Sequence, residues 1–151
     1  MTGFYHVCFV VPDIEQAMRD FRRSAGVEWS DPVSDRMGEW DYRIVFSRGG
    51  APFIELITGP AGSPWDASRG ARFDHIGFWS SDVGQASRRL EKEGMPVDFS
   101  GCPYGRPFAY HRMDSIGGRV EFVDISRQAA FLDRWHPGGE PMPALDENSR
   151  G

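Results

Sequence analysis

Two histidines and two glutamates are the side chains best suited to chemistry, and they occupy matching places in the two halves of the chain. His6 and His75 each lie in a short stretch of β-branched and aromatic residues, 69 positions apart. Glu55 and Glu121 each interrupt an apolar stretch further along the same halves. Burying an unpaired carboxylate in such a stretch costs several kcal/mol or keeps the group protonated, whereas a bound cation stabilises it. These four residues therefore predict a site for a divalent cation.

The donor types limit which metal the site would hold. Two imidazoles and two carboxylates suit Zn, Ni, Co, Mn or Fe better than Ca, which takes more oxygen ligands. We therefore expect one divalent metal ion as cofactor, with its identity left open. Each residue alone also has a structural explanation: the histidines could be ordinary core residues, and the glutamates could pair with nearby arginines, namely Arg43, Arg48, Arg112 and Arg119. The occurrence of all four at equivalent positions favours the metal.

The elements that must position these residues also repeat. Each half opens with a strand-like stretch, followed by an aspartate and, three residues later, a glutamine, at Asp13 and Gln16 and again at Asp82 and Gln85. This spacing is a capping box, which predicts the start of a helix. Apolar residues at helical spacing then follow, as Ile14, Ala17, Met18, Phe21 and Ala25 in the first half and Val83, Ala86 and Leu90 in the second.

Strand pairs follow each expected helix. Glycine-containing breaks separate 41–47 from 52–58 and 107–113 from 119–125, with weaker strands near 28–33 and 96–100. The chain is therefore predicted to be α+β, with a βαβββ module twice in one domain. We expect that domain over 1–136, with module one at 4–58, module two at 73–125 and a short helix at 126–136, followed by a flexible tail over 137–151.

Composition excludes several classes of protein. The net charge is −5 and no dense cluster of basic residues occurs, which argues against binding to nucleic acid. No apolar run is long enough for a membrane span or a signal sequence. The two cysteines, Cys8 and Cys102, are far apart and form no Cys-x-x-Cys pattern, which argues against a disulfide scaffold or a cysteine zinc site. We expect a cytoplasmic protein that acts on a small molecule.

Four segments of the chain resemble the vicinal oxygen chelate superfamily, which includes glyoxalase I, methylmalonyl-CoA epimerase, extradiol dioxygenases and bleomycin-resistance proteins. They are 6–13, 53–56, 74–78 and 117–122, and the resemblance covers about 4–126. It implies two βαβββ modules whose sheets curl into a cleft with a metal on its floor. It also implies a homodimer, because members commonly complete the cleft across two chains.

The branches of this superfamily differ in their ligands. Glyoxalase I and methylmalonyl-CoA epimerase fill all four places, in agreement with His6, Glu55, His75 and Glu121. The resemblance therefore favours an epimerase-like isomerase that acts on a small acyl or carbonyl substrate through a metal-stabilised enolate. The alternatives are a glyoxalase I-type lyase, a metal-free protein that binds a small molecule or antibiotic, and an Fe(II) extradiol-type dioxygenase. The dioxygenases use only two histidines and one glutamate.

Two glutamates are candidates for the catalytic base. Segment 38–46 resembles the part of the epimerases that carries a catalytic glutamate, which would be Glu39 here. Glu121 is the second candidate, because a ligand carboxylate can also take a proton. The loop 111–116 departs from the epimerase motif, so the resemblance does not establish coenzyme A as part of the substrate.

Aromatic and basic residues suggest the character of the substrate. The predicted pocket has aromatic walls suited to a hydrophobic acyl group, from Trp40, Trp65, Trp79, Phe108 and Tyr110, although core packing explains these residues equally. An anionic group of the substrate could be bound by one of three arginines, Arg43, Arg106 and Arg119, although surface ion pairs explain these too.

Overall fold

The chain forms the βαβββ unit twice. The computed structural model describes residues 2–145. The first unit comprises β1 (Phe4–Val10), α1 (Ile14–Ala25), β2 (Val33–Met37), β3 (Trp40–Phe46) and β4 (Phe53–Thr58). The second comprises β5 (Arg72–Ser80), α2 (Val83–Lys92), β6 (Val97–Ser100), β7 (Phe108–Met113) and β8 (Gly118–Asp124). A last helix, α3 (Gln128–Trp135), follows β8.

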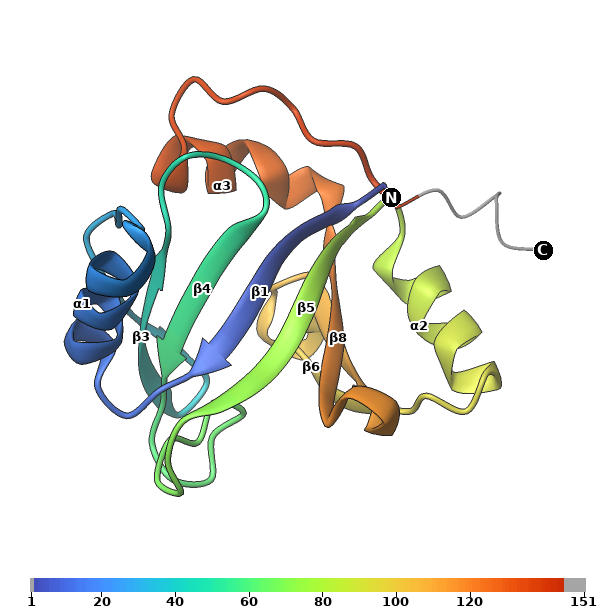
Figure 1. Ribbon diagram of the computed structural model, residues 1–151. Coiled ribbons are helices and arrows are strands. Elements are labelled where there is room, and N and C mark those ends of the chain that lie inside the picture. Colours follow the sequence, from blue (N-terminus) through green and yellow to red (C-terminus); the bar gives the residue numbers. More distant parts are fainter. Residues whose placement is uncertain (1, 146–151) are drawn as a thin grey trace.

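All strands belong to one curled sheet with the order β2-β3-β4-β1-β5-β8-β7-β6. The two units meet at its centre, where β1 and β5 pair antiparallel. Each of these strands also pairs in parallel with the last strand of its own unit, β1 with β4 and β5 with β8. Helices α1 and α2 flank the two halves, and α3 crosses one end of the curled sheet (Figure 1). The predicted α+β fold with two modules is confirmed.

Both main helices begin where the sequence predicts. The side chain of Asp13 accepts a hydrogen bond from the Gln16 amide at 3.0 Å, and Asp82 accepts one from the Gln85 amide at 3.0 Å. The reciprocal half of the first capping box does not form, because the Gln16 side chain bonds instead to Asp20, at 2.9 Å. Gly26 then ends α1 in the left-handed conformation, with φ of 70°, which glycine adopts without strain.

One strand differs clearly from its expected position. β2 covers Val33–Met37 rather than 28–33. The segment before it packs against α1 instead, since Trp29 is buried and its Nε1 donates a hydrogen bond to the Met18 carbonyl at 3.1 Å. The short final helix lies within the expected 126–136, but a 3₁₀ turn (Ile125–Arg127) precedes it and Asp124 caps that turn.

The segment after α3 is held in place by hydrogen bonds. Residues 137–145 were expected to belong to a flexible tail, yet the Gln128 side chain bonds to both backbone groups of Met142, at 2.8 and 2.9 Å. The Leu145 amide donates to the Trp79 carbonyl at 2.7 Å. This stretch therefore packs on the domain and follows a defined path past the start of β1 (Figure 1). The rest of the expected tail, 146–151, lies outside the described residues.

The two faces of the sheet have different roles. Alternate side chains point to opposite faces, so Val45 and Leu56 pack toward α1 while Val120 and Phe122 pack toward α2. The inner face is filled partly by Trp65, which comes from the segment that joins the two units and whose Nε1 donates to the Tyr110 hydroxyl at 2.9 Å. No helix among residues 2–145 is long and apolar enough to cross a membrane.

Candidate metal centre

The four predicted ligands lie on the four central strands. His6 is on β1, Glu55 on β4, His75 on β5 and Glu121 on β8. In the register of the sheet, Cys8 is paired with both Glu55 and His75, while Gly77 is paired with both His6 and Glu121. Each glutamate is therefore two residues out of register with the histidine of its own unit. All four side chains lie on the same inner face of the curled sheet.

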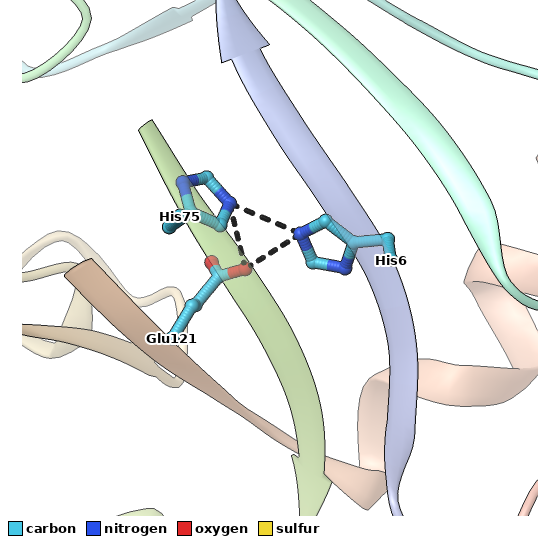
Figure 2. Close-up of side chains that lie close together, drawn as sticks. All are labelled: His6, His75 and Glu121. Atoms are coloured by element: carbon cyan, nitrogen blue, oxygen red, sulfur yellow. Dashed lines mark hydrogen bonds and ion pairs between the residues drawn. The ribbon is translucent and has the colours of Figure 1, made fainter. Parts of the chain in front are cut away.

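The side chains meet through their terminal atoms. His6 Nε2 lies 3.0 Å from His75 Nε2. Glu121 Oε1 lies 3.2 Å from His6 Nε2 and 3.3 Å from His75 Nε2, as Figure 2 shows. Glu55 Oε1 lies 3.5 and 3.2 Å from the same two nitrogens. The structure therefore brings all four predicted ligands together, within a single chain.

The geometry of this cluster fits a divalent cation. Ligand atoms about 2.0–2.2 Å from a tetrahedral ion lie about 3.3–3.6 Å from one another. This is close to the 3.0–3.5 Å between the two histidine nitrogens and between each of them and the nearest oxygen of each glutamate. Glu55 Oε1 is buried and has no hydrogen-bond partner among residues 2–145, despite its two nitrogen neighbours. Buried polar atoms are normally satisfied, so an oxygen in this position fits the role of a metal ligand. His6, His75 and Glu121 form a two-histidine, one-carboxylate group whose ligand atoms lie within 4.8 Å of one another.

A hydrogen-bonded chain orients His75. Its Nδ1 donates to Asp74 Oδ2 at 2.7 Å, which leaves the Nε2 lone pair directed at the cluster. Asp74 Oδ2 in turn accepts from Arg119 at 2.6 Å, and the Arg119 guanidinium lies 4.0 Å from the centre of the Tyr110 ring. Burial raises the pKa of Asp74, but His75 and Arg119 outweigh it and hold the pKa at about 2.

The electrostatics of the cluster favour charged carboxylates. Burial raises the pKa of Glu121, but the neighbouring imidazoles of His75 and His6 outweigh it and hold the pKa at about 2. Burial by itself lowers the pKa of His75, yet its neighbours outweigh burial and raise the pKa well above its ordinary value; in order of effect they are Cys8, Tyr110, Glu121 and Asp74. A proton and a metal cation thus compete for the same His75 lone pair.

Glu39 is not part of this cluster. It is exposed in the turn between β2 and β3 and borders a pocket with Asp41, Arg43 and Thr58. The inner-face residue of β3 that pairs with Glu55 is Phe46, which carries no carboxylate. The structure therefore places the two proposed catalytic glutamates in different surroundings, Glu121 at the cluster and Glu39 at the surface.

The sequence left open that Glu55 and Glu121 form ion pairs with nearby arginines instead of binding a metal. None of those ion pairs forms among the described residues. Arg43 pairs with Glu15 at 2.5 Å, and Arg112 pairs with Asp114 at 3.0 Å. Arg119, one of three arginines considered for a substrate anion, is buried and bound to Asp74 and Asp98. Arg106 pairs with Asp35.

Sequence reasoning missed the roles of three residues that shape the site. Asp74 and Arg119 orient His75 through the chain described above. In the sequence, each is visible only as a charged residue beside the apolar stretch of a strand that carries a proposed metal ligand. Gly77 lies against His6, where an added Cβ would come within 1.9 Å of the ring. The repeat contained the signal for this glycine, because Gly77 occupies the place in module two that Cys8 occupies in module one.

Solved structures with the same fold come from methylmalonyl-CoA epimerases and an uncharacterised relative. The epimerase from Mycobacterium tuberculosis is 20% identical, with 81% of this chain and 87% of that chain covered and a TM-score of 0.56. A variant of the Streptomyces coelicolor epimerase in complex with 2-nitronate-propionyl-CoA is 19% identical, with 82% and 97% covered and a TM-score of 0.60. A hypothetical protein from Bacillus halodurans is 17% identical, with 80% and 92% covered and a TM-score of 0.62.

The sequence itself also places the chain in a family. No curated protein matches it significantly. The model of the glyoxalase/bleomycin resistance/dioxygenase superfamily matches residues 5–110, which is more than half of the chain. Together with the two βαβββ units, this match identifies the chain as a member of the glyoxalase/bleomycin resistance/dioxygenase superfamily.

Proposed function

We propose that this protein is a metal-dependent isomerase or epimerase that removes a proton beside the carbonyl group of a small acyl or carbonyl substrate and then returns it. The observation that carries the proposal is the convergence of His6, His75, Glu55 and Glu121 within 3.0–3.5 Å on the inner face of the sheet. Family membership supports it, since the fold neighbours named above include epimerases of an acyl thioester. A glyoxalase I-type lyase would use the same four ligands.

The four clustered side chains would hold one divalent cation. A bound cation supplies a Lewis acid that polarises the substrate carbonyl and stabilises the negative charge that develops when the proton leaves. The chain contributes the orientation of its donors, because Asp74 fixes the ring and the tautomer of His75. It also excludes water, since both histidines and both glutamates are buried.

Glu121 is the base in this proposal. Its carboxylate lies at the cluster, where a substrate carbonyl would bind, and its low pKa keeps it in the ionised form that a general base requires. Glu39, the other candidate, would have to act from the turn between β2 and β3.

Metal analysis combined with deuterium exchange tests the function. The purified protein is expected to contain about one divalent metal ion per chain, and to exchange the proton beside the carbonyl of a 2-substituted acyl thioester or a ketone in heavy water. Removing the metal with a chelator should stop the exchange. If no carbonyl compound of either class exchanges with the metal-loaded protein, the proposed reaction is wrong.

Two glutamine variants identify the base. Glu121→Gln should reduce exchange by at least about 100-fold, as expected for loss of a general base, while Glu39→Gln should leave it within twofold. Metal content is measured on both, because Glu121 is also a ligand. Exchange that is lost in Glu39→Gln and kept in Glu121→Gln would transfer the role to Glu39.

A dioxygenase is the second candidate, because His6, His75 and Glu121 match the ligand set of non-haem Fe(II) oxygenases. Glu55 Oε1 disfavours it, since this atom lies 3.2 Å from His75 Nε2 and occupies the space that oxygen would need. Oxygen uptake by the Fe(II)-loaded protein with catechols would support the dioxygenase instead.

We also expect a homodimer, as the family resemblance implies. The metal ligands do not require it, because they converge within one chain. Light scattering during gel filtration at micromolar concentration should give twice the mass of the chain, and a monomer would contradict the expectation.

A further inference from the structure

A pocket of about 360 Å³ lies between the inner face of the sheet and α3. Its walls are aromatic, from Tyr5, Trp79, Phe131 and Trp135. The pocket borders the proposed metal cluster without including its four residues, because the ring centre of Tyr5, a wall residue, lies 4.4 Å from that of His6. Val123, another wall residue, follows Glu121 by two positions on β8 and so points to the same face.

One wall residue carries an unused hydrogen-bond donor. Trp79 is 1% exposed, yet its Nε1 has no hydrogen-bond partner in the part of the chain that the structure describes. Its ring is stacked on Tyr5, with centres 4.0 Å apart. A buried indole N–H normally finds an acceptor, and its absence here is costly. A ligand that fills the pocket with an acceptor oxygen would satisfy this donor.

Two arginines stand at the same pocket with no acidic partner. Arg127 and Arg134 are separated by two helical turns and line the pocket from the α3 side, with the small Ala130 between them. Neither forms an ion pair with another described residue. The acidic wall residue, Asp35, is already engaged by Arg106 and by the Tyr42 hydroxyl. The free charge at the pocket is therefore positive.

From these features we infer that the pocket binds the substrate as a compact carboxylic acid with a planar apolar body and a carbonyl oxygen. The aromatic walls take the planar body, the Trp79 N–H donates to the oxygen, and Arg127 and Arg134 bind the carboxylate. The inference rests on the proposed function and specifies its substrate class. At about 360 Å³ the pocket is at the small end of ligand sites, so a compact acid fits better than a coenzyme A thioester. Both arginines lie outside residues 5–110, the part of the chain that the superfamily model matches.

Calorimetric binding of benzoylformate tests this inference. This acid is planar and has a ketone oxygen, but no proton that could be enolised, so its binding is independent of the proposed reaction. The metal-loaded protein should bind it about tenfold more tightly than its uncharged methyl ester, the gain expected from charge-assisted hydrogen bonds at partly exposed arginines. Equal binding of acid and ester would overturn the inference, whatever the exchange experiment shows.

Matched variants locate the binding. The double variant Arg127→Gln/Arg134→Gln should abolish the preference for the acid, whereas Arg22→Gln/Arg23→Gln, with the same change of charge on α1, should keep it. Trp79→Phe removes the N–H together with one ring of the indole and should weaken both ligands about equally, by several-fold. Thermal unfolding checks that each variant is folded. If the double variant Arg127→Gln/Arg134→Gln binds the acid as tightly as the unmodified protein does, these two arginines do not bind its carboxylate and the inference is contradicted.

Binding of coenzyme A tests whether the two arginines recognise a phosphorylated ligand instead of a carboxylic acid. The compact-acid class predicts that coenzyme A binds more weakly than benzoylformate and does not displace it. If coenzyme A binds more tightly, displaces benzoylformate and depends on the same two arginines, the arginines recognise a phosphorylated carrier and the inferred class is wrong.

Discussion

The two halves of the molecule hold the same proposed metal ligand, a histidine, in two different settings. His6 and His75 hold equivalent positions in the repeat, and each has the equivalent cross-strand neighbour, Phe53 for His6 and Arg119 for His75. The residue before each histidine also differs, since Tyr5 precedes His6 and Asp74 precedes His75. Module two therefore places an acidic and a basic side chain around its histidine, where module one places two aromatic rings.

This difference determines how each imidazole is held. His75 Nδ1 is bound to Asp74, which is bound to Arg119. His6 Nδ1 is buried without a partner, and the His6 ring is instead enclosed by Tyr5, Phe46 and the backbone of Gly77. One ligand is thus oriented by charge and hydrogen bonding, the other by packing. A duplicated module can keep its ligands while the means of holding them diverges.

The largest effect should come from breaking the packing around His6. In Gly77→Ala the new Cβ would come within 1.9 Å of the His6 ring, so the imidazole has to leave its position. We expect metal affinity to fall by at least about 100-fold, because a ligand is lost. Metal titration with a competing chelator measures this effect.

Ser80→Ala on the same strand serves as the control for Gly77→Ala, since it also changes a buried residue but does not touch the cluster. Metal affinity in Gly77→Ala within threefold of the unmodified protein would show that His6 is not held by packing.

Breaking the electrostatic support of His75 should have the next largest effect. Asp74→Asn keeps the size of the side chain but removes the charge that orients and activates the ring. The expected loss of metal affinity is about 10–100-fold, the range typical of such supporting carboxylates. The matched change in module one, Tyr5→Phe, should alter metal affinity by less than threefold. Equal effects of the two substitutions would remove the distinction between the halves.

The repeat made part of this comparison predictable from sequence. The pairs His6/His75 and Glu55/Glu121 are visible because equivalent residues recur at a nearly constant spacing, and the same reasoning located both main helices at Asp13 and Asp82. Local signals of this kind survive in any fold that contains the repeat.

The contacts that orient the site were not predictable in the same way. The bond between Asp74 and Arg119 joins residues 45 positions apart, and only the register of β5 against β8 reveals it. The path of residues 137–145 likewise depends on acceptors far along the chain, such as the Trp79 carbonyl. Glu39 was proposed from a resemblance between segments, which does not determine where a turn residue points.

A smaller effect on metal affinity is expected from Arg119→Lys. Lysine keeps the positive charge beside Asp74 but cannot bind Asp74, Asp98 and the Pro64 carbonyl at once, as the guanidinium does. Metal affinity should fall by about threefold to tenfold, less than in Asp74→Asn, because the carboxylate remains. The same titration measures it, and a loss greater than that of Asp74→Asn would mean that Arg119 acts on the metal by another route.

The smallest effect should come from Cys8→Ala, the position in module one that corresponds to Gly77. Cys8 is fully buried and is paired with both Glu55 and His75 in the sheet, so its sulfur lies beside the cluster. Because four other donors already surround the cation site, we expect metal affinity to change by less than twofold. The free energy of unfolding should fall by about 1 kcal/mol, since the substitution leaves a small cavity. Denaturant unfolding of the metal-free protein measures the stability, and metal titration measures the affinity. A tenfold loss of affinity with unchanged stability would instead make the Cys8 thiol a metal ligand, and module one would then contribute a donor that module two lacks.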